Sequence, residues 1–473
     1  MTFRTVPVQI TGGSYLSQSR PLSSQQTINL YPKIVPQGKE QAVLFSFPGL
    51  KRLGSELGAD RGLHRMAEVL YQVKGTRLYT IDKFGAHSDL GAIEGSDRCI
   101  MADDGINLFI VSASGVYRYN SDTGAIDIVT DTNIVGAKSV AFINNQFIYT
   151  NDKFSVVSNV GDGSTANGLN IIGEESLPDD MVRDFVFDDI IYRCSERSIV
   201  AWYNSGVGNP PIEKLQGRIF QVGLAAIHSI ARTDDALYWL GDDFSIYQSN
   251  AGAKVKVSTD AISNEIQSYG KVSDAIGRTF IVDGISFYAI TFPTGGKTFV
   301  ISESLGAQGW FELSSGIEGG AYQGSSFIEC YGKTHVADEK NGNIYTLCNK
   351  TFTNDGETMQ RVRVTSSANG DLIGAKGQFV QMSKAKFIME TGNGLISGQG
   401  EDPRIMVEYS DNGGKSWKHG GWPRIGRLGE NTLQVNFFNM GKFYDRIFRI
   451  TMTDPVPLYL YSATIDIRQV NNG

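Results

Sequence analysis

The sequence predicts an all-β protein whose largest part is a β-propeller. Two features of the composition indicate short strands joined by tight turns: 54 of the 473 residues are glycine, and 11% are aromatic. Glycine permits the positive φ angles of such turns, whereas Tyr and Phe fit the half-buried face of a sheet. No long stretch has helical periodicity. In addition, a sequence unit of about 40–50 residues recurs, which is the length of one propeller blade.

Residues 1–60 precede the repeat and do not follow it. Two segments combine aromatic residues with proline, Ile28-Asn-Leu-Tyr-Pro32 and Phe45-Ser-Phe-Pro-Gly-Leu50. Proline fixes φ and interrupts strand pairing, so we expect an extended arm with short strands. The arm either closes the ring, packs beneath it, or contacts a neighbouring subunit. The last alternative makes four residues candidate interface residues: Tyr31, Pro32, Phe47 and Pro48. In that case a chain lacking residues 1–55 should fold but not assemble.

The repeat occupies residues 61–352. Each unit has a polar turn, an apolar strand ending in aromatics, a second turn, and a strand with an apolar-Tyr pair, as in Asp234–Trp239 and Ser245–Tyr247. The acidic or Asn turns begin at positions 103, 144, 188, 234 and 283, so they are spaced by 41, 44, 46 and 49 residues. Because a lone blade cannot bury both of its faces, such units stack into a ring. Seven such hairpins occur with drifting spacing, which leaves six or seven blades open.

Several units begin with adjacent aspartates, such as Asp103-Asp104 and Asp188-Asp189. One interpretation is acid–base or metal chemistry, since glycosidases use two carboxyl groups that converge on the substrate. Adjacent side chains of an extended strand point in different directions, however. Asp and Asn also favour turns, because their side chains bind the nearby backbone. Recurrence at the same phase of each unit therefore favours a structural turn.

The formal net charge is −7, and the acidic excess lies in the first three-quarters of the chain. A negative chain is unsuited to holding nucleic acid through counterion release. One interpretation is that the acidic excess keeps an ordinary solvated surface soluble. The alternative is an acidic channel wall past which DNA slides without binding.

Residues 353–473 follow a different β pattern. Polar and apolar residues alternate in Gln360–Val364, Ala385–Glu390, Asp445–Met452 and Ala463–Arg468. This period of two indicates strands with one buried and one wet face, as in an antiparallel sandwich. The hairpin Ser410–Trp417 resembles a sialidase-type Asp box, although Asn412 stands where the box has Asp. Such boxes are structural turns that bury the Trp. Trp417 is a further candidate for a subunit or partner interface.

Motifs of common catalytic and cofactor sites are absent from the sequence. It has no Gly-x-Ser-x-Gly elbow, Walker loop, His-Glu-x-x-His or dinucleotide fingerprint. The four cysteines lack a Cys-x-x-Cys pair and the five histidines do not cluster, so no disulfide framework or metal site is expected. We see no apolar signal-peptide core and no run near the roughly 18 apolar residues of a membrane span. We expect a non-enzymatic protein without cofactor, made in a reducing cytoplasm.

Four stretches resemble the tail hub, or nozzle, proteins of short-tailed bacteriophages (podoviruses), which are also called packaged DNA stabilisation proteins or tail accessory factors. They are Ile28–Pro32, Ser46–Leu53, Arg61–Tyr79, and the C-terminal run from Glu408–Trp417 through Arg446–Pro457. These stretches touch both ends of the chain and occur in the order found in the family.

The resemblance implies a propeller of six blades, assembled as a homo-hexameric tube below the portal and its adaptor (head-to-tail) protein. The tube extends the DNA channel and helps retain the packaged genome, which passes through the lumen without sequence-specific binding. Tailspikes or tail fibres dock around it, and a tail needle or plug closes it. The protein would be assembled in the host bacterial cytoplasm and reside in the virion tail, without stable membrane insertion. The family has no catalytic residues to carry over.

Two alternatives compete with a tail hub. A monomeric adhesin would be a binding disc rather than a subunit of a closed ring. A glycan-binding or sialidase-like propeller would need several Asp boxes and a cluster of arginines facing one central pocket. The sequence contains one degenerate box.

Overall fold

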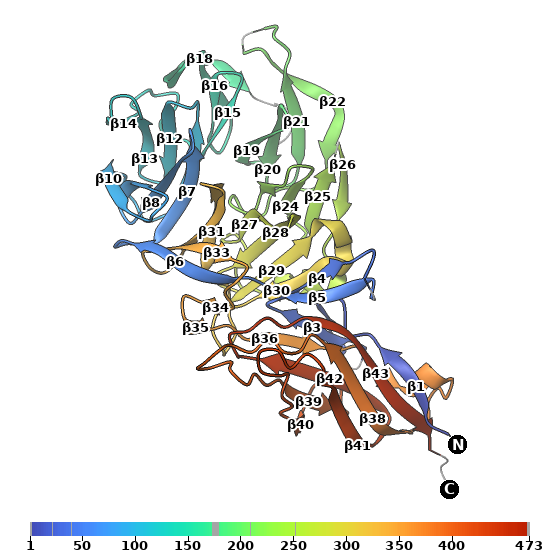
Figure 1. The fold of residues 1–473 in the computed structure, drawn as a ribbon. Coiled ribbons are helices and arrows are strands. Elements are labelled where there is room, and N and C mark those ends of the chain that lie inside the picture. The colour runs from blue at the N-terminus through green and yellow to red at the C-terminus, as the bar shows by residue number, and fades with distance from the viewer. Residues whose placement is uncertain are drawn as a thin grey trace.

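The computed structural model describes residues 2–20, 22–38, 40–172, 179–208, 210–250 and 252–470. A propeller and a smaller sandwich follow one another, and N-terminal strands lie at their junction (Figure 1). Short helices are few: α1 (Asp260–Gln267), η1 (Glu303–Gly309) and η2 (Gly370–Ile373). Helix α1 begins at Thr259, whose hydroxyl caps the Ile262 amide, and it buries Ile262 and Ile266. The predicted all-β class is confirmed.

Seven four-stranded antiparallel units form the propeller in the described part of the chain. From inner to outer strand they are as follows. The first is β7 (Asp60–Met66), β8 (Val69–Lys74), β9 (Arg77–Ile81) and β10 (His87–Ala92); the second is β11 (Ile100–Asp103), β12 (Asn107–Ser112), β13 (Gly115–Asn120) and β14 (Ile126–Ile128). The third is β15 (Ser139–Ile143), β16 (Gln146–Thr150), β17 (Ser155–Asn159) and β18 (Asp162–Ile172); the fourth is β19 (Met181–Phe187), β20 (Ile190–Ser195), β21 (Ile199–Asn204) and β22 (Ile212–Phe220). The fifth is β23 (Ala231–Arg232), β24 (Leu237–Leu240), β25 (Ile246–Asn250) and β26 (Ala253–Lys256). The sixth is β27 (Ile276–Val282), β28 (Ile285–Phe292), β29 (Lys297–Ser302) and β30 (Trp310–Leu313); the seventh is β31 (Gly324–Cys330), β32 (Lys333–Asp338), β33 (Asn343–Cys348) and β6 (Gly49–Ser55).

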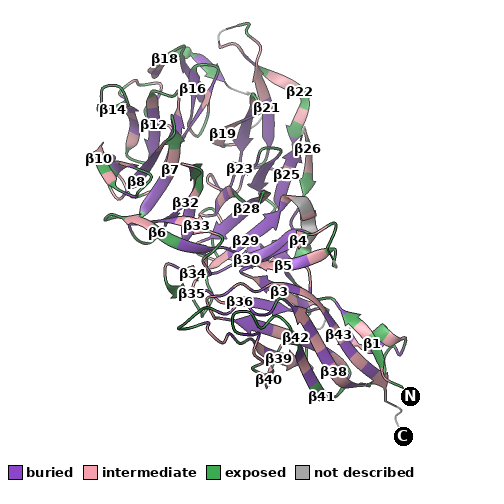
Figure 2. Ribbon diagram, viewed as in Figure 1, coloured by how far each residue is buried: buried purple, intermediate pink, exposed green. Residues whose placement is uncertain are grey.

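The inner strands close into a ring because β31 of the seventh blade contacts β7 of the first. At this closure the carboxylate of Asp60 accepts hydrogen bonds from the hydroxyls of Ser325 (2.7 Å) and Ser326 (2.6 Å). The apolar residues between neighbouring blades are buried (Figure 2). The predicted propeller is therefore present.

The blade number of six that the resemblance implied is wrong for this chain, which has seven. The seventh blade is composite, because its outer strand β6 comes from the N-terminal residues and pairs with β33 from Asn343↔Ser55 to Cys348↔Gly49. The seven hairpins of the sequence correspond to the seven blades, but the repeat does not show that the outer strand of the last blade comes from about 300 residues away. Of the two blade numbers that the repeat left open, the larger one is correct.

The N-terminal residues are paired with both parts of the molecule rather than extended as an arm. Besides β6, they supply strands whose partners lie in the sandwich or at its junction with the propeller: β1 (Arg4–Val8), β2 (Tyr15–Leu16), β3 (Ser24–Ile28), β4 (Leu30–Ile34) and β5 (Ala42–Ser46). Strand β3 pairs in parallel with β30 of the sixth blade through Ile28↔Glu312, and antiparallel with β36 (Arg361–Val364) of the sandwich. Of the three alternatives for the N-terminal segment, closure of the ring is the one that β6 adopts, and the other N-terminal strands pair within the same chain.

Two facing sheets form the C-terminal sandwich. One contains β1, β38 (Val380–Met389), β41 (Val435–Phe443) and β43 (Leu460–Gln469), and it joins the β4–β5 hairpin. The other contains β3, β36, β39 (Met406–Ser410), β40 (Lys418–Gly421) and β42 (Asp445–Met452), with β37 (Ala368–Asn369) at its edge. The short hairpin β34 (Thr353–Asn354) and β35 (Glu357–Thr358) joins the seventh blade. Phe387, Phe448 and Ile465 fill the core between the two sheets.

Strand β36 departs from the alternation that the sequence predicted. All of its residues are buried, and Arg361 and Arg363 have no exposed surface. The guanidinium of Arg363 donates to the Ile10 carbonyl (2.6 Å), Gln25 Oε1 (2.8 Å) and Thr27 Oγ1 (2.8 Å). N-terminal residues therefore cover the face that was expected to be wet. The predicted alternation holds for β38 and β43 but not for β42, in which six of the eight residues are buried.

The geometry of the paired aspartates is that of turns. Asp188 and Asp189 have φ angles of 51° and 57° and form the two-residue loop between β19 and β20. Positive φ at both central residues is the signature of a type I′ hairpin turn, whose twist matches that of the strands. Asp104 instead accepts hydrogen bonds from the backbone amides of Ile106 and Asn107 at 2.9 and 2.6 Å. Asp103 accepts from the Gly105 amide at 2.9 Å, and its other carboxylate oxygen lies 2.6 Å from His64 Nε2. These aspartates thus lie in turns, as their residue type favours.

Candidate functional site

The four predicted interface residues of the N-terminal segment lie inside this chain's own core. Tyr31 and Phe47 are 1% and 0% exposed, and Pro32 and Pro48 are buried. The Tyr31 ring packs edge-to-face on Phe287 with centroids 5.6 Å apart, and its hydroxyl donates to Asp283 Oδ2 at 2.8 Å. Burial and this carboxylate raise the pKa of Tyr31 above its ordinary value. The geometry accounts for these residues within one chain and does not offer them to a partner.

Asn29, between these aromatic positions, was not singled out by the sequence interpretation. It is fully buried with a φ of 53°. Its amide group donates to the carbonyls of Ser314 (3.0 Å) and Gln360 (2.7 Å), and its side-chain oxygen accepts from the Ser314 amide (3.1 Å). Asn29 thus connects the sixth blade to the sandwich. The signal was available, because Asn is among the few non-glycine residues that adopt left-handed backbone readily.

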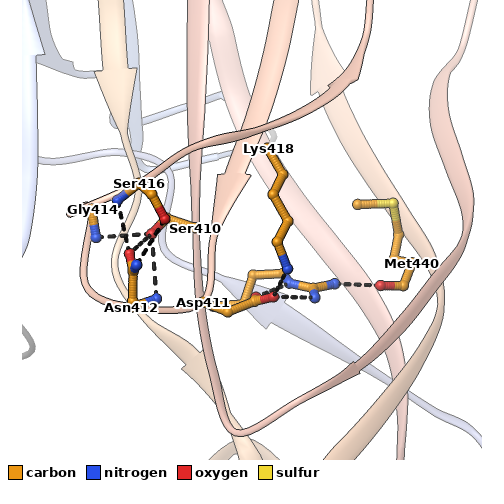
Figure 3. Close-up of polar contacts among 8 residues, drawn as sticks. Ser410, Asp411, Asn412, Gly414, Ser416, Lys418 and Met440 are labelled. Carbon is orange, nitrogen blue, oxygen red and sulfur yellow. Dashed lines mark hydrogen bonds and ion pairs between the residues drawn. The ribbon is translucent and has the colours of Figure 1, made fainter.

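The hairpin between β39 and β40 contains the turn that resembles an Asp box (Figure 3). Asn412 Oδ1 accepts from the Ser416 amide at 3.0 Å, and Asn412 Nδ2 donates to Ser416 Oγ at 2.8 Å. The Ser410 hydroxyl accepts from the Gly414 amide at 2.9 Å and donates to Asn412 Oδ1 at 2.8 Å. Asn412 therefore performs the turn-closing role expected of Asp in the box. The hairpin belongs to the sandwich and not to a propeller blade.

Asp411 points away from the turn toward Lys418 (Figure 3). The buried guanidinium of Arg446 holds this carboxylate with two bonds, Nε to Oδ1 at 2.6 Å and Nη2 to Oδ2 at 3.0 Å. Its third nitrogen donates to the Met440 carbonyl at 2.6 Å. These bonds tie Asp411 and Arg446 to each other and to the backbone of the sandwich.

Trp417, the remaining interface candidate, is partly exposed. Its ring lies 4.3 Å from the Arg449 guanidinium and packs against the cluster of Val362, Val364 and Ile447. One face of the ring is thus occupied by this chain. A contact of Trp417 with another subunit stays a prediction.

A cavity of about 450 Å³ lies among the inner strands at the propeller axis. Its lining includes Arg98, Arg183, Arg232 and Arg278, and no Asp or Glu of the described residues belongs to the lining. The wall of this cavity is therefore basic, so the hypothesis of an acidic channel wall does not apply to the axis of a single propeller. Arginines at one central pocket fit one requirement of a glycan-cleaving propeller. The carboxylates that such chemistry also needs are missing from the described lining.

Potential metal ligands are dispersed over the described ranges of the chain. No group of three or more His, Cys, Asp or Glu residues there could hold a metal ion. The four cysteines are unpaired, and burial raises the pKa of the Cys99 thiol to about 12. None of the helices in those ranges is long and apolar enough to cross a membrane.

A closed seven-bladed propeller joined to a β-sandwich, with structural rather than catalytic polar contacts at the predicted positions, defines a class of scaffold protein. A family model described as "Bacteriophage P22 Gp10, beta-propeller" matches residues 5–352, and the chain belongs to this family. It is accordingly a structural, DNA-stabilising protein of a phage tail, and so a virion component.

Solved structures share only a distant likeness with the chain. The computationally designed Ika8 protein is 10% identical, with a TM-score of 0.39 over 69% of this chain and 100% of that chain. The N-terminal domain of Nup159 is 8% identical, with a TM-score of 0.40 over 68% of this chain and 99% of that one. PorZ, a surface component of the type-IX secretion system of Porphyromonas gingivalis, is 13% identical, with a TM-score of 0.39. It covers 78% of this chain, which spans only 46% of PorZ. No curated protein matches the sequence.

Proposed function

We propose that six copies of this protein form the hub, or nozzle, of a short phage tail. The family match over residues 5–352 carries the proposal. The hub would extend the DNA channel below the portal and its adaptor protein and would help to retain the packaged genome. It would act without catalysis, as expected for a structural family.

The way in which the propeller and the sandwich are joined suits a rigid subunit of a larger assembly. Strand β3 is hydrogen-bonded on one side to the sixth blade and on the other to β36 of the sandwich. Strand β6 of the same N-terminal segment completes the seventh blade. Because these strands are paired rather than linked by a flexible segment, the propeller and the sandwich are suited to act as one rigid block in a closed ring.

The charge of the chain suits a conduit for DNA. Each copy has a net charge of −7, and six copies around one lumen would multiply the repulsion of the phosphate backbone. DNA would pass without sequence-specific binding. Tailspikes or tail fibres would dock on the outside of the hub, and a needle or plug would close its distal end.

The mass of the purified protein tests this proposal, measured alone and after mixing with portal–adaptor complexes. Electron microscopy of the mixed particles should reveal six copies capping the portal. A protein that stays monomeric in both conditions would contradict the proposal and favour the alternative of a monomeric adhesin or glycan-binding propeller. A glycan screen would then be the next experiment.

A further inference from the structure

The basic cavity at the propeller axis contains arginines with buried nitrogen atoms that have no hydrogen-bond partner. Arg278 on β27 is 5% exposed, yet its Nε and Nη1 atoms are buried without a hydrogen-bond partner. Its remaining nitrogen, Nη2, donates to Thr291 Oγ1 at 2.7 Å. Arg183 on β19 donates to the Ile227 carbonyl at 3.1 Å, while its Nε is likewise buried and unpartnered. A buried charged group that lacks a hydrogen-bond partner costs free energy. Two such arginines in one cavity therefore indicate a missing hydrogen-bond acceptor.

The positive charges in the cavity act on one another. Burial, followed by the nearby charge of Arg98, lowers the pKa of Arg278 to about 9. Burial and the charges of Arg98 and Arg183 hold the pKa of His228 well below its ordinary value. A guanidinium keeps its proton at neutral pH even under such strain, whereas a histidine is neutral there and can donate one N–H.

Only one of these arginines has an acidic partner among the described residues. Arg98 Nη1 lies 3.8 Å from the buried carboxylate of Asp60, and Arg98 Nη2 donates to the Ser325 carbonyl at 3.0 Å. Asp60 is further occupied by the two serine hydroxyls that close the ring. Arg183 and Arg278 lie over the rings of Phe185 and Phe327, 5.2 and 5.1 Å from the ring centroids, but no described carboxylate pairs with them. The described part of the chain therefore supplies no negative charge that balances these two arginines.

We propose that the axial cavity binds a phosphate-type oxyanion between Arg98, Arg183 and Arg278, with His228 as an additional donor. Guanidinium groups match phosphate oxygens in geometry and charge. The cavity of about 450 Å³ has room for an inorganic ion or for the phosphate group of a larger ester. Neither source is favoured by the protein contacts, which would be the same for both.

The anion would hold separate blades together. Arg98 precedes β11 of the second blade, Arg183 lies on β19 of the fourth, and Arg278 lies on β27 of the sixth. A ligand that contacts all three crosses the axis and connects blades that are not neighbours. Because it would bind the folded ring and not the unfolded chain, its presence should raise the thermal stability.

Calorimetric and thermal-shift titrations of the full-length, phosphate-free protein with inorganic phosphate test the site. Sodium chloride keeps the ionic strength constant, so general screening does not change. We expect saturable binding and a melting temperature that rises with phosphate concentration. R278Q should weaken phosphate binding at least tenfold and, because it removes an uncompensated buried charge, should not melt below the wild type in phosphate-free buffer.

The variant R183Q provides a second test if R278Q does not fold, and it should weaken binding in the same way. R427Q, which removes an exposed arginine from the sandwich, is the matched control and should bind like the wild type. Thymidine monophosphate distinguishes the two sources: tighter binding than phosphate identifies an ester, and equal or weaker binding identifies the free ion. The absence of saturable binding, or equal binding by R278Q, R183Q and R427Q, would overturn the proposal.

Discussion

Single buried polar residues hold the parts of this protein together. Asn29 joins the sixth blade to the sandwich, and Lys74 joins the first blade to the seventh by donating to the Gly342 carbonyl at 2.7 Å. Each has at most 1% of its surface exposed. A buried polar group that loses its hydrogen-bond partner lowers the free energy of unfolding. Substitution of either residue should therefore destabilise the protein more than substitution of an exposed polar residue.

Replacing Asn29 with Ala should lower the free energy of unfolding by about 3 kcal/mol or more. The substitution leaves the Ser314 amide and two carbonyls without partners, each at about 1–3 kcal/mol, and places alanine in left-handed backbone. Denaturant unfolding of purified N29A measures the loss. N29G is the matched control, because it relieves the backbone strain but not the lost hydrogen bonds, and should fall between N29A and the wild type. An N29A protein as stable as the wild type would contradict the role of Asn29 at the junction.

Lys74 should make stability depend on pH in the alkaline range. Burial lowers its pKa to about 8 in the folded protein, against 10.5 as the ordinary value. Between these values the unfolded chain binds the proton and the folded chain does not. Stability should therefore rise with pH across that window, by at most about 1.4 kcal/mol per pH unit, and the gain is lost again as the pH falls through 8.

The measurement is the difference in unfolding free energy between the wild type and K74M at intervals from pH 7 to 10. The wild type should gain on the variant as the pH rises above about 8. K83M removes an exposed lysine from the turn after β9 and controls for the loss of one positive charge. A difference that does not change with pH would show that burial does not lower the pKa of Lys74 in the folded protein.

At the scale of elements, the blades depend on tight hairpins between the inner strand and the next one. The loops Ala67-Glu68, Asn144-Asn145 and Asp188-Asp189 have positive φ at both residues. Only glycine takes up this backbone without cost, and Asn and Asp tolerate it better than Ala or Glu. The three loops therefore adopt the same turn geometry with residues that differ in their preference for positive φ. Ala67-Glu68 of the first blade is the least favourable pair.

The double substitution A67N/E68G should stabilise the protein by about 1 kcal/mol, because Asn-Gly is the preferred type I′ pair. Both residues are exposed, so few packing contacts change. The midpoint of thermal or denaturant unfolding reports the gain. G284A is the opposite control: Gly284 has a φ of 74° and open space around it, so its substitution should destabilise through the backbone alone. A destabilised A67N/E68G protein would show that this turn is not of type I′.

For the whole molecule, the closure of the ring depends on the N-terminal residues. Removing residues 1–55 deletes β6, leaves the edge of β33 unpaired, and removes the buried Leu50 from the core between the sixth and seventh blades. We therefore expect this truncated chain to unfold or aggregate, rather than to fold as a monomer as the interpretation of an extended arm implied. Circular dichroism and size-exclusion chromatography distinguish these outcomes. A soluble, folded truncated protein would show that three strands suffice for the seventh blade.

A point substitution tests the same closure with less disruption. A Cβ atom at Gly54 of β6 would lie 2.3 Å from the Gly85 carbonyl oxygen of the first blade. G54A should therefore push β6 outward and lower the melting temperature. G270A, at an exposed glycine with an ordinary φ and open space around it, is the control for loss of a glycine without a clash. Equal melting temperatures for G54A and wild type would mean that β6 does not pack against the first blade in solution.

The sequence by itself determined the local structure: the all-β class, the recurring hairpins, the turns at Asp188 and Asp283, and the alternating strands β38 and β43. These features depend on residues close together in the chain, because turn preference and strand alternation are local properties. The tertiary structure decided between six and seven blades, because the outer strand of the seventh, β6, meets β33 across about 300 residues. It also decided the burial of Tyr31, Phe47 and Arg363. The cluster of Arg98, Arg183 and Arg278 was likewise decided by the tertiary structure. Closure of the ring brings residues from different blades to one axis, and no pattern of neighbouring residues in the sequence predicts this proximity.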